Sequence, residues 1–301
     1  MNKRLAAAAF LILLALPAPA WLQSLYPFQD KPLDVPYVPS KPEVVSEMLR
    51  MAKVGKDDLL YDLGCGDGRI VITAARLFGT RGVGYDIDPE RIKESKANAD
   101  EAGVSHLVKF FEQDIFEADF REATVVSLYL LTSVNLRLRP KLLTQLRPGT
   151  RVVSHNYAMD TWKPDDSAVV MVNDQSHNVY LWIVPANVSG SWEWTWAEGD
   201  RKVAYALNLD QHFQWPAGEL KAGGKVWDLR DVSLKGNELQ FKAESEERGK
   251  TQTMTFSGKI NGNTMEGTVA TSGLSSAGTR AWKAKRNPAT MKPLDTEGPA
   301  Y

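Results

Sequence analysis

The chain has 301 residues, of which 43% are hydrophobic and 24% are charged. These values are typical of a soluble globular protein of one or two domains, and they argue against wholesale disorder and against a multi-span membrane protein. Thirty-six basic and 37 acidic residues leave a net charge of −1, so we expect no nucleic-acid partner held by bulk positive charge. The single cysteine, Cys65, excludes an intrachain disulfide, and the histidine spacing predicts no metal site.

Residues 1–20 have the layout of a secretory signal peptide. Two basic residues, Lys3 and Arg4, precede an apolar run and the small-residue sequence Ala18-Pro19-Ala20. The sequence therefore predicts cleavage after Ala20 and export of the remainder. The alternative is a membrane anchor through residues 5–20, although this run is shorter than the roughly 20 residues that a membrane-spanning helix needs.

Residues 21–186 alternate between strand and helix patterns. Pro42 to Val54 has apolar residues at helical spacing, and Ser40 with Glu43 resembles a capping box. Further helices are predicted at 70–78, 89–102 and 140–146. Strands are predicted at 59–63, 82–87, 108–111, 123–131 and 150–155, followed by a hairpin of 169–172 and 179–184. This alternation predicts a doubly wound α/β sheet with a mainly parallel core.

Residues 187–286 contain only short β patterns. These lie at 191–196, 203–209, 232–234, 238–243, 251–260, 264–271 and 280–285. Regular short strands without helices predict a small antiparallel barrel or sandwich, loosely similar to lipocalin-like modules. Trp192, Trp194 and Trp196 alternate with polar residues and therefore share one face, which we interpret as core. Residues 287–301 are expected to form a loose tail.

A glycine-rich loop follows the first predicted strand of the α/β region. Its sequence places Gly64, Gly66 and Gly68 at alternate positions after Asp62. Glycine lets a ligand approach the backbone because no Cβ is in the way. An acidic residue before the first glycine favours a cationic ligand with an amino acid moiety over a pyrophosphate, which prefers free backbone amides.

Two more acidic residues follow the next strands. Asp86 ends the second strand, where a carboxylate can bind both hydroxyls of a ribose. Asp88 is the better candidate for capping the helix that begins at Pro89. Asp114 follows the third strand, where it can accept a hydrogen bond from an adenine amino group. Because the strands are expected to be parallel, these carboxylates should gather at one edge of the sheet.

Four segments carry a resemblance to a known family: DLGCGDGRI at 62–70, VPYVPS at 35–40, LLTSVN at 130–135 and RVVSH at 151–155. In these segments the chain resembles class I S-adenosylmethionine-dependent methyltransferases. More narrowly, it resembles the archaeal protein-lysine methyltransferase and the mitochondrial lysine methyltransferases of ATP synthase subunit c and the ADP/ATP carrier. The resemblance runs from about Asp34 to Val184. It implies a seven-stranded sheet, S-adenosyl-L-methionine as cofactor and a protein lysine as methyl acceptor.

The resemblance also implies roles for individual residues. Tyr37 and Ser40 would close over the cofactor; Asp62, Gly64 and Gly66 would line its methionine side, Asp86 would bind its ribose and Asp114 its adenine. Candidates beside the acceptor are Tyr129 and Asn135, then His155 and Tyr157. The box Asn-Pro-Pro-Tyr of amide and adenine methyltransferases is absent at 128–131. Two alternatives stay open: an envelope binding protein with a degenerate methyltransferase domain, and a small-molecule methyltransferase.

Overall fold

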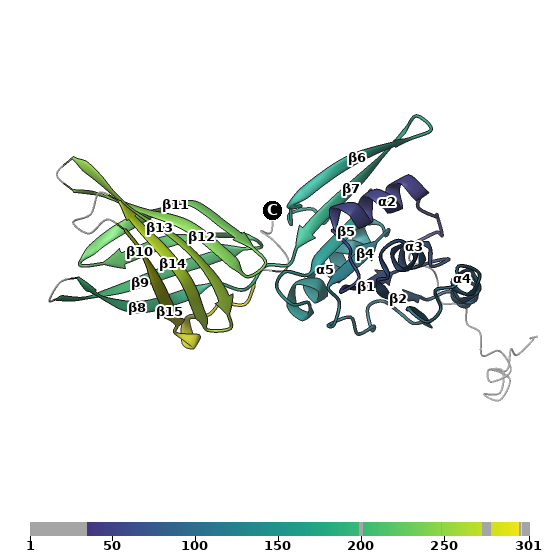
Figure 1. The fold of residues 1–301 in the computed structure, drawn as a ribbon, viewed down its shortest axis with the longest axis horizontal. Coiled ribbons are helices and arrows are strands. Elements are labelled where there is room, and N and C mark those ends of the chain that lie inside the picture. Colours follow the sequence, from purple (N-terminus) through teal and green to yellow (C-terminus); the bar gives the residue numbers. More distant parts are fainter. Residues whose placement is uncertain (1–34, 199–200, 248, 273–277, 295, 297–301) are drawn as a thin grey trace, which may run out of the picture. The chain divides into compact units, whose positions relative to one another are not determined.

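The computed structural model of the protein describes residues 35–198, 201–247, 249–272, 278–294 and 296 (Figure 1). The predicted signal segment, residues 1–20, lies outside them. The α/β region contains α2 (Pro42–Met51), β1 (Leu59–Leu63), α3 (Arg69–Phe78), β2 (Arg81–Asp86), α4 (Pro89–Glu101), β3 (Val108–Glu112), β4 (Val125–Leu128), α5 (Thr132–Gln145), β5 (Arg151–His155), β6 (Asp166–Val172) and β7 (Gln175–Ile183). The β region contains β8 (Gly190–Glu198), β9 (Arg201–His212), β10 (Trp215–Ala222), β11 (Lys225–Lys235), β12 (Glu238–Glu247), β13 (Lys250–Asn261), β14 (Thr264–Ser272) and β15 (Gly278–Arg286), followed by η1 (Pro288–Thr290).

The first seven strands form one sheet in the order β3-β2-β1-β4-β5-β7-β6. Strands β1 to β5 pair in parallel, and β7 runs antiparallel to β5 and β6. The predicted doubly wound sheet and its terminal hairpin are therefore confirmed. Because β1, β2, β4 and β5 are parallel, their carboxyl ends share one edge, and the antiparallel β7 brings its amino end to the same edge.

Both faces of this sheet are covered by helices. Leu60 packs in a cluster with residues of α2 and α3, such as Val44, whereas Tyr61 packs in a cluster with residues of α5, such as Leu138. Successive strand residues point to opposite faces, so the almost wholly apolar β1 and β4 have buried side chains on both. This two-sided burial explains why these strands read as continuous apolar runs.

The β region forms a closed barrel in the order β10-β11-β12-β13-β14-β15-β8-β9. Its interior is a packed aromatic core. Trp192 and Trp194 are buried, and Trp196 packs against the same cluster. The expectation that the three tryptophans form core rather than a ligand platform fits this packing.

The tip of the barrel hairpin β9–β10 contributes to the core of the α/β region. Phe213 is fully buried in the cluster that holds Leu138, and its ring stacks on Trp162 at a centroid distance of 6.1 Å. Next to it, the Gln214 side chain donates a hydrogen bond to the Lys163 carbonyl, 2.7 Å away. The predicted boundary between residues 186 and 187 stays a prediction, but the two regions share these side-chain contacts.

Three local predictions were wrong. Strand β10 was missed, because its Pro216 and Gly218 are residues that interrupt most strands. A Cβ at Gly218 would lie 1.9 Å from the Asn208 carbonyl oxygen, so the close approach of β9 requires glycine there. Helix α5 begins eight residues before the predicted start and contains Pro140, since burial of Val134 and Leu138 against the sheet outweighs the lost hydrogen bond.

The third error concerns the tail, which is not loose throughout. Residues 288–290 form the short helix η1, and Thr290 Oγ1 accepts a hydrogen bond from the Ser191 backbone N–H, 2.8 Å away. Within the described ranges, no helix has the length and apolar character needed to cross a membrane.

Candidate active site

The loop between β1 and α3 is shaped by glycines in the left-handed backbone region. Gly64 has φ +82° and Gly66 has φ +52°. A Cβ at Gly64 would lie 2.8 Å from Leu130 Cδ2, and one at Gly66 would lie 2.5 Å from Tyr37 Cε2. Because these positions have no Cβ, the Leu130 and Tyr37 side chains lie close against the loop backbone at the carboxyl edge of the sheet, and a larger residue there would displace them.

Asp62 lies directly before this loop and is 2% exposed. Its Oδ1 accepts a hydrogen bond from Ser127 Oγ, 2.7 Å away on the neighbouring β4. Burial raises the pKa of the Asp62 carboxyl to about 7, because the Ser127 hydrogen bond offsets only part of the desolvation. No cationic side chain among the described residues forms an ion pair with Asp62. A buried carboxylate of this kind favours a cationic ligand.

Asp86 ends β2 and is bound to the loop. Its Oδ2 accepts the Gly66 backbone N–H at 2.8 Å, and its Oδ1 accepts the Asp88 backbone N–H at 3.0 Å. Burial raises the pKa of Asp86, and these backbone hydrogen bonds oppose the rise. Each oxygen keeps acceptor capacity, so the carboxylate can hold the loop and bind hydroxyls at once. Asp88 caps α4 through the Glu90 backbone N–H, as expected.

Asp114 and Tyr37 lie at the outer parts of the site. Asp114 is half-buried, and its Oδ1 accepts the Phe116 backbone N–H at 2.9 Å, which fixes the turn after β3. The Tyr37 ring lies over Gly66 and is 42% exposed. The Arg91 guanidinium lies 4.6 Å from the centre of that ring. The Tyr37 hydroxyl also donates a hydrogen bond to the Asp67 side chain, so the ring is held against the loop on which a ligand would lie.

Ser40 does not cap α2; the capping-box prediction was wrong. The N-cap residue is Lys41, and its side chain forms no capping hydrogen bond with the first turn of α2. Ser40 Oγ lies instead 2.9 Å from His155 Nδ1, and its carbonyl accepts a hydrogen bond from Arg69 Nη1 at 2.8 Å. Because His155 is 115 residues away in the chain, local spacing could not have indicated this contact.

An aromatic wall formed by Tyr129, His155 and Tyr157 follows β4 and β5. The Tyr129 ring stacks on His155 at a centroid distance of 3.8 Å, and Tyr157 lies 6.2 Å from Tyr129. Burial raises the pKa of Tyr129 and lowers the pKa of His155 to about 4, so His155 is neutral at physiological pH. The wall thus presents neutral aromatic groups beside Leu130, which touches the loop.

Asn135, a candidate predicted beside the acceptor, lies inside the fold. Its side chain is fully buried, and Nδ2 donates a hydrogen bond to the Tyr157 carbonyl, 3.0 Å away. Asn135 lies on the first turn of α5 and faces the sheet, so it supports the loop that carries Tyr157. It is a positioning residue in this arrangement.

His177 was not singled out from the sequence. Its Nδ1 lies 2.9 Å from His155 Nε2. Side chains alternate between the two faces along β7, so His177 shares a face with Val179, which pairs with His155. This alternation was the sequence signal that could have indicated the contact between the two histidines. Neither residue's partner could be assigned without the strand register.

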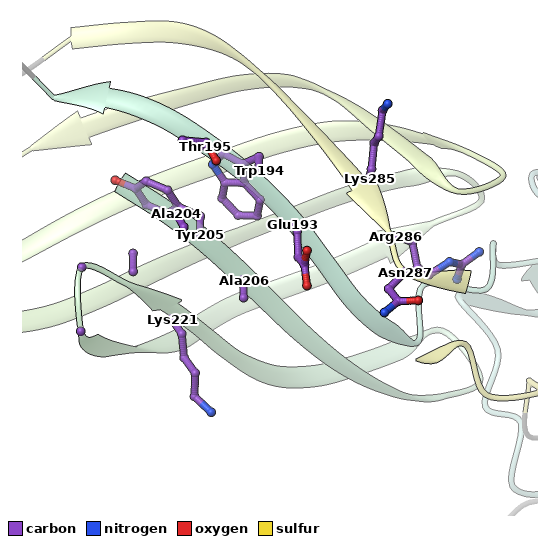
Figure 2. Close-up of a pocket in the computed structure, with 13 residues that line it drawn as sticks. Glu193, Trp194, Thr195, Ala204, Tyr205, Ala206, Lys221, Lys285, Arg286 and Asn287 are labelled. Carbon is purple, nitrogen blue, oxygen red and sulfur yellow. The ribbon is translucent and has the colours of Figure 1, made fainter. Parts of the chain in front are cut away.

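A hollow lies against strands β8, β9, β10 and β15 of the barrel (Figure 2). Its volume is about 670 Å³, and its lining includes Glu193, Ala204, Ala206, Lys221 and Lys285. Glu193 pairs across the strands with both Lys285 and Ala206, and Ala206 pairs with Lys221, so these residues form one row across four strands. None of the residues predicted for the active site lines this hollow.

The strand order, the acidic glycine loop and the acidic ends of β1 and β2 define a class I methyltransferase that depends on S-adenosylmethionine. Residues 62–166 match the family model of the ANTKMT methyltransferase domain. Over 151 residues the chain is 48% identical to a protein-lysine N-methyltransferase of Saccharolobus islandicus, covering 50% of this chain and 94% of that protein. The chain therefore belongs to the same methyltransferase family as that archaeal protein.

Two further similarities concern the same region. The chain is 32% identical over 167 residues to the adenine nucleotide translocase lysine N-methyltransferase of Mus musculus, covering 54% of this chain and 71% of that protein. A crystal structure described as an RNA methyltransferase from Salinibacter ruber in complex with S-adenosyl-L-homocysteine is 54% identical, covers 50% of this chain and 96% of that chain, and has a TM-score of 0.47. The family model ends at residue 166, before the barrel begins.

The residues of the loop fit S-adenosylmethionine. Asp62 is a buried carboxylate that the ammonium of the methionine moiety would neutralise, and the Tyr37 ring lies against Gly66, where it would contact a ligand on the loop. Asp86 retains acceptors for ribose hydroxyls next to Gly66. The assignment of these residues, and of Asp114 to adenine, stays a prediction.

Proposed function

We propose that the protein transfers a methyl group from S-adenosylmethionine to the ε-amino group of a lysine in a protein. The observation that carries this proposal is the aromatic wall: Tyr129 stacked on a buried, neutral His155 at the ends of β4 and β5. A lysine amine attacks only when it is neutral, and an apolar aromatic surface lowers the pKa of an ammonium group by desolvation. The name of the Saccharolobus islandicus relative supports the same acceptor.

The chain's own residues would then perform binding and alignment. The cofactor, when bound, supplies an electrophilic methyl group on a sulfonium. Asp62 and Asp86 would hold the cofactor against the loop, next to the residues that follow β4. Tyr129 and Tyr157 orient the amine in line with the bond that breaks, which is the main contribution required of the protein.

The two alternatives receive less support. A degenerate binding protein would not need to keep Asp62, the left-handed glycines and Asp86 in mutual contact. A small-molecule methyltransferase would not explain the similarity to two lysine methyltransferases over most of their length. We propose that the barrel docks the acceptor protein, since it lies beyond the region that the family model matches.

Export through residues 1–20 is a separate proposal. It is supported by the basic, apolar and small-residue segments of that sequence. Expression of the full chain in a bacterial host, with N-terminal sequencing of the product from each fraction, tests it. Cleavage after Ala20 supports export. An intact N-terminus in the membrane fraction favours the anchor, and an intact soluble protein removes the proposal.

The acceptor is tested by labelled methyl transfer. The purified protein is incubated with methyl-labelled S-adenosylmethionine and a total extract that contains proteins, nucleic acids and small molecules, and the label is located by mass spectrometry. We expect the label on lysine side chains. Label on RNA, on carboxylates or on small molecules, with none on lysine, would contradict the lysine assignment and leave the methyltransferase class intact.

A further inference from the structure

Three side chains from distant parts of the chain form a continuous hydrogen-bonded row. Ser40 Oγ lies 2.9 Å from His155 Nδ1, and His155 Nε2 lies 2.9 Å from His177 Nδ1. Ser40 is 3% exposed and His155 is 1% exposed, whereas His177 is half-buried. The row therefore leads from Ser40 through His155 to His177 on β7, whose Nε2 is buried and has no partner among the described residues.

The buried end of this row lies between the two halves of the proposed site. Ser40 is tied to the start of α3, directly after the glycine loop, because Arg69 Nη1 donates to its carbonyl at 2.8 Å. His155 carries the stacked Tyr129 ring on its face. An amine aligned by Tyr129 toward the glycine loop would thus approach the Ser40 hydroxyl.

The row can hold its protons in two matching arrangements. In one, the Ser40 hydroxyl donates to His155 Nδ1, His155 Nε2–H donates to His177 Nδ1, and His177 carries its proton on Nε2. In the other, His177 Nδ1–H donates to His155 Nε2, His155 Nδ1–H donates to the Ser40 hydroxyl oxygen, and His177 Nε2 carries no proton. Both arrangements contain only neutral imidazoles, which agrees with the low pKa that burial, and secondarily the charge of His177, imposes on His155.

We propose that Ser40, His155 and His177 form a proton relay that accepts a proton from the acceptor ammonium and releases one at the sheet edge. This inference rests on the proposed lysine acceptor. Ser40 Oγ takes one ammonium proton and gives its own to His155 Nδ1, His155 passes its Nε2 proton to His177 Nδ1, and His177 Nε2 gives its proton to a water that enters beside this buried, unpartnered atom. The amine is left neutral with its electron pair free. Ser40 is the catalytic member because it touches the amine; the histidines act through it.

The titratable groups that face His155 are Tyr129 from β4 and His177 from β7, and Ser40 faces it from the segment before α2. Three variants interrupt the row at different points. Ser40→Ala removes the inner end, His155→Phe keeps a ring for Tyr129 to stack on, and His177→Phe removes the outer end. His106→Phe is the matched control, since His106 is an exposed histidine before β3.

Two measurements on the full chain test the relay. First, turnover with labelled S-adenosylmethionine and lysine acceptors is followed between pH 6.5 and 9.5. We expect a loss of about 100-fold at neutral pH in each row variant and a profile displaced to higher pH, with cofactor affinity within twofold of the wild type in His155→Phe and His177→Phe. Added imidazole should restore activity in His177→Ala, which leaves a space the size of the lost ring at a half-buried position, and not in Ser40→Ala. His106→Phe should behave as the wild type.

The second measurement needs no turnover. Nitrogen-15 NMR of the imidazole rings reports which nitrogen of each histidine carries the proton. In a connected row, Ser40→Ala should change the ring shifts of His177, two hydrogen bonds away. Unchanged His177 shifts, or a His177→Phe variant with wild-type rate and pH profile, would overturn the relay and leave the lysine acceptor standing. A wild-type protein that methylates no lysine would remove the proposed function and the relay together.

Discussion

The Asp86 carboxylate accepts a hydrogen bond from the Gly66 backbone N–H, 2.8 Å away, so the end of β2 is tied directly to the loop after β1. Asp86 Oδ1 accepts the Asp88 backbone N–H, so the other oxygen fixes the turn between β2 and α4. A residue predicted to bind the cofactor is therefore also a support for the loop on which the cofactor would lie.

Replacement of Asp86 should weaken cofactor binding. Asp86→Ala removes a carboxylate whose hydrogen bonds to hydroxyls contribute about 1.5–3 kcal/mol, so we expect affinity for S-adenosylhomocysteine to fall roughly tenfold or more by calorimetry. Asp88→Ala is the control, because Asp88 caps α4 and should lower stability by about 1 kcal/mol without changing affinity. Equal affinity in folded Asp86→Ala would remove Asp86 from the site.

Cofactor affinity should depend on pH through Asp62. Burial raises the pKa of Asp62 to about 7, so the carboxyl is protonated below that pH and cannot neutralise an ammonium. Affinity should therefore fall as pH drops below about 7, approaching tenfold for each pH unit. In Asp62→Asn the affinity should be low at every pH and nearly flat between pH 5.5 and 7.5. A wild-type profile that is flat over this range would exclude Asp62 as the ammonium partner.

The same group should affect stability without ligand. The folded-state pKa of Asp62 lies above that of the unfolded chain, so its contribution to stability is fully present at low pH and is lost as pH rises through about 7. Asp62→Asn should consequently melt at a higher temperature than the wild type at pH 8, when neither has ligand.

Tyr129 should influence turnover more than cofactor affinity. Tyr129→Ala removes the ring that stacks on His155, so the amine loses its orienting surface while the glycine loop is unchanged. We expect kcat to fall by about 100-fold, with cofactor affinity within threefold of the wild type. Tyr129→Phe keeps the ring and should retain most of the activity. A large loss of affinity in Tyr129→Ala would show instead that Tyr129 contacts the cofactor.

Much of the fold could be predicted because the signal was local. The apolar runs of β1 and β4, the left-handed glycines after Asp62 and the Asp88 cap depend on neighbouring residues. The errors occurred where contacts between residues far apart in the sequence determine the local structure. Gly218 and Pro216 read as a strand interruption, although Gly218 permits the approach of Asn208. Helix α5 tolerates Pro140 because its buried face packs on the sheet.

Like the fold, the candidate site could be predicted where the signal lay in neighbouring residues, and not where distant segments meet. Asp62, Gly66 and Asp86 follow parallel strands, so strand order alone gathers them. The contact of Ser40 with His155 joins segments 115 residues apart, and His177 reaches the site only because β7 runs antiparallel to β5. The burial of Asn135 could not be predicted, because the predicted helix began at residue 140 and did not include it.

Phe213 provides a test of how far the barrel is independent. The side chain is fully buried against Trp162 in the α/β core, so Phe213→Ala should lower the free energy of unfolding by about 3–5 kcal/mol. Trp215→Ala, two residues away at a side chain that is 44% exposed, should change it by about 0.5 kcal/mol or less. Denaturant titration measures both. Equal effects would mean that Phe213 does not join the two regions.

The most direct test of the glycine-loop site compares two glycines by calorimetry with S-adenosylhomocysteine. Gly66 and Gly79 both have left-handed backbones, at φ +52° and +69°, but a Cβ at Gly66 meets Tyr37 at 2.5 Å, whereas one at Gly79 meets nothing within 4 Å. Both alanine variants should therefore bear the backbone strain of about 1 kcal/mol, and only Gly66→Ala should push the Tyr37 ring away from the loop on which the cofactor would lie. We predict one binding site in the wild type and in Gly79→Ala with equal affinity, and a loss of tenfold or more in Gly66→Ala. Wild-type affinity in a folded Gly66→Ala protein would contradict the placement of the cofactor on this loop.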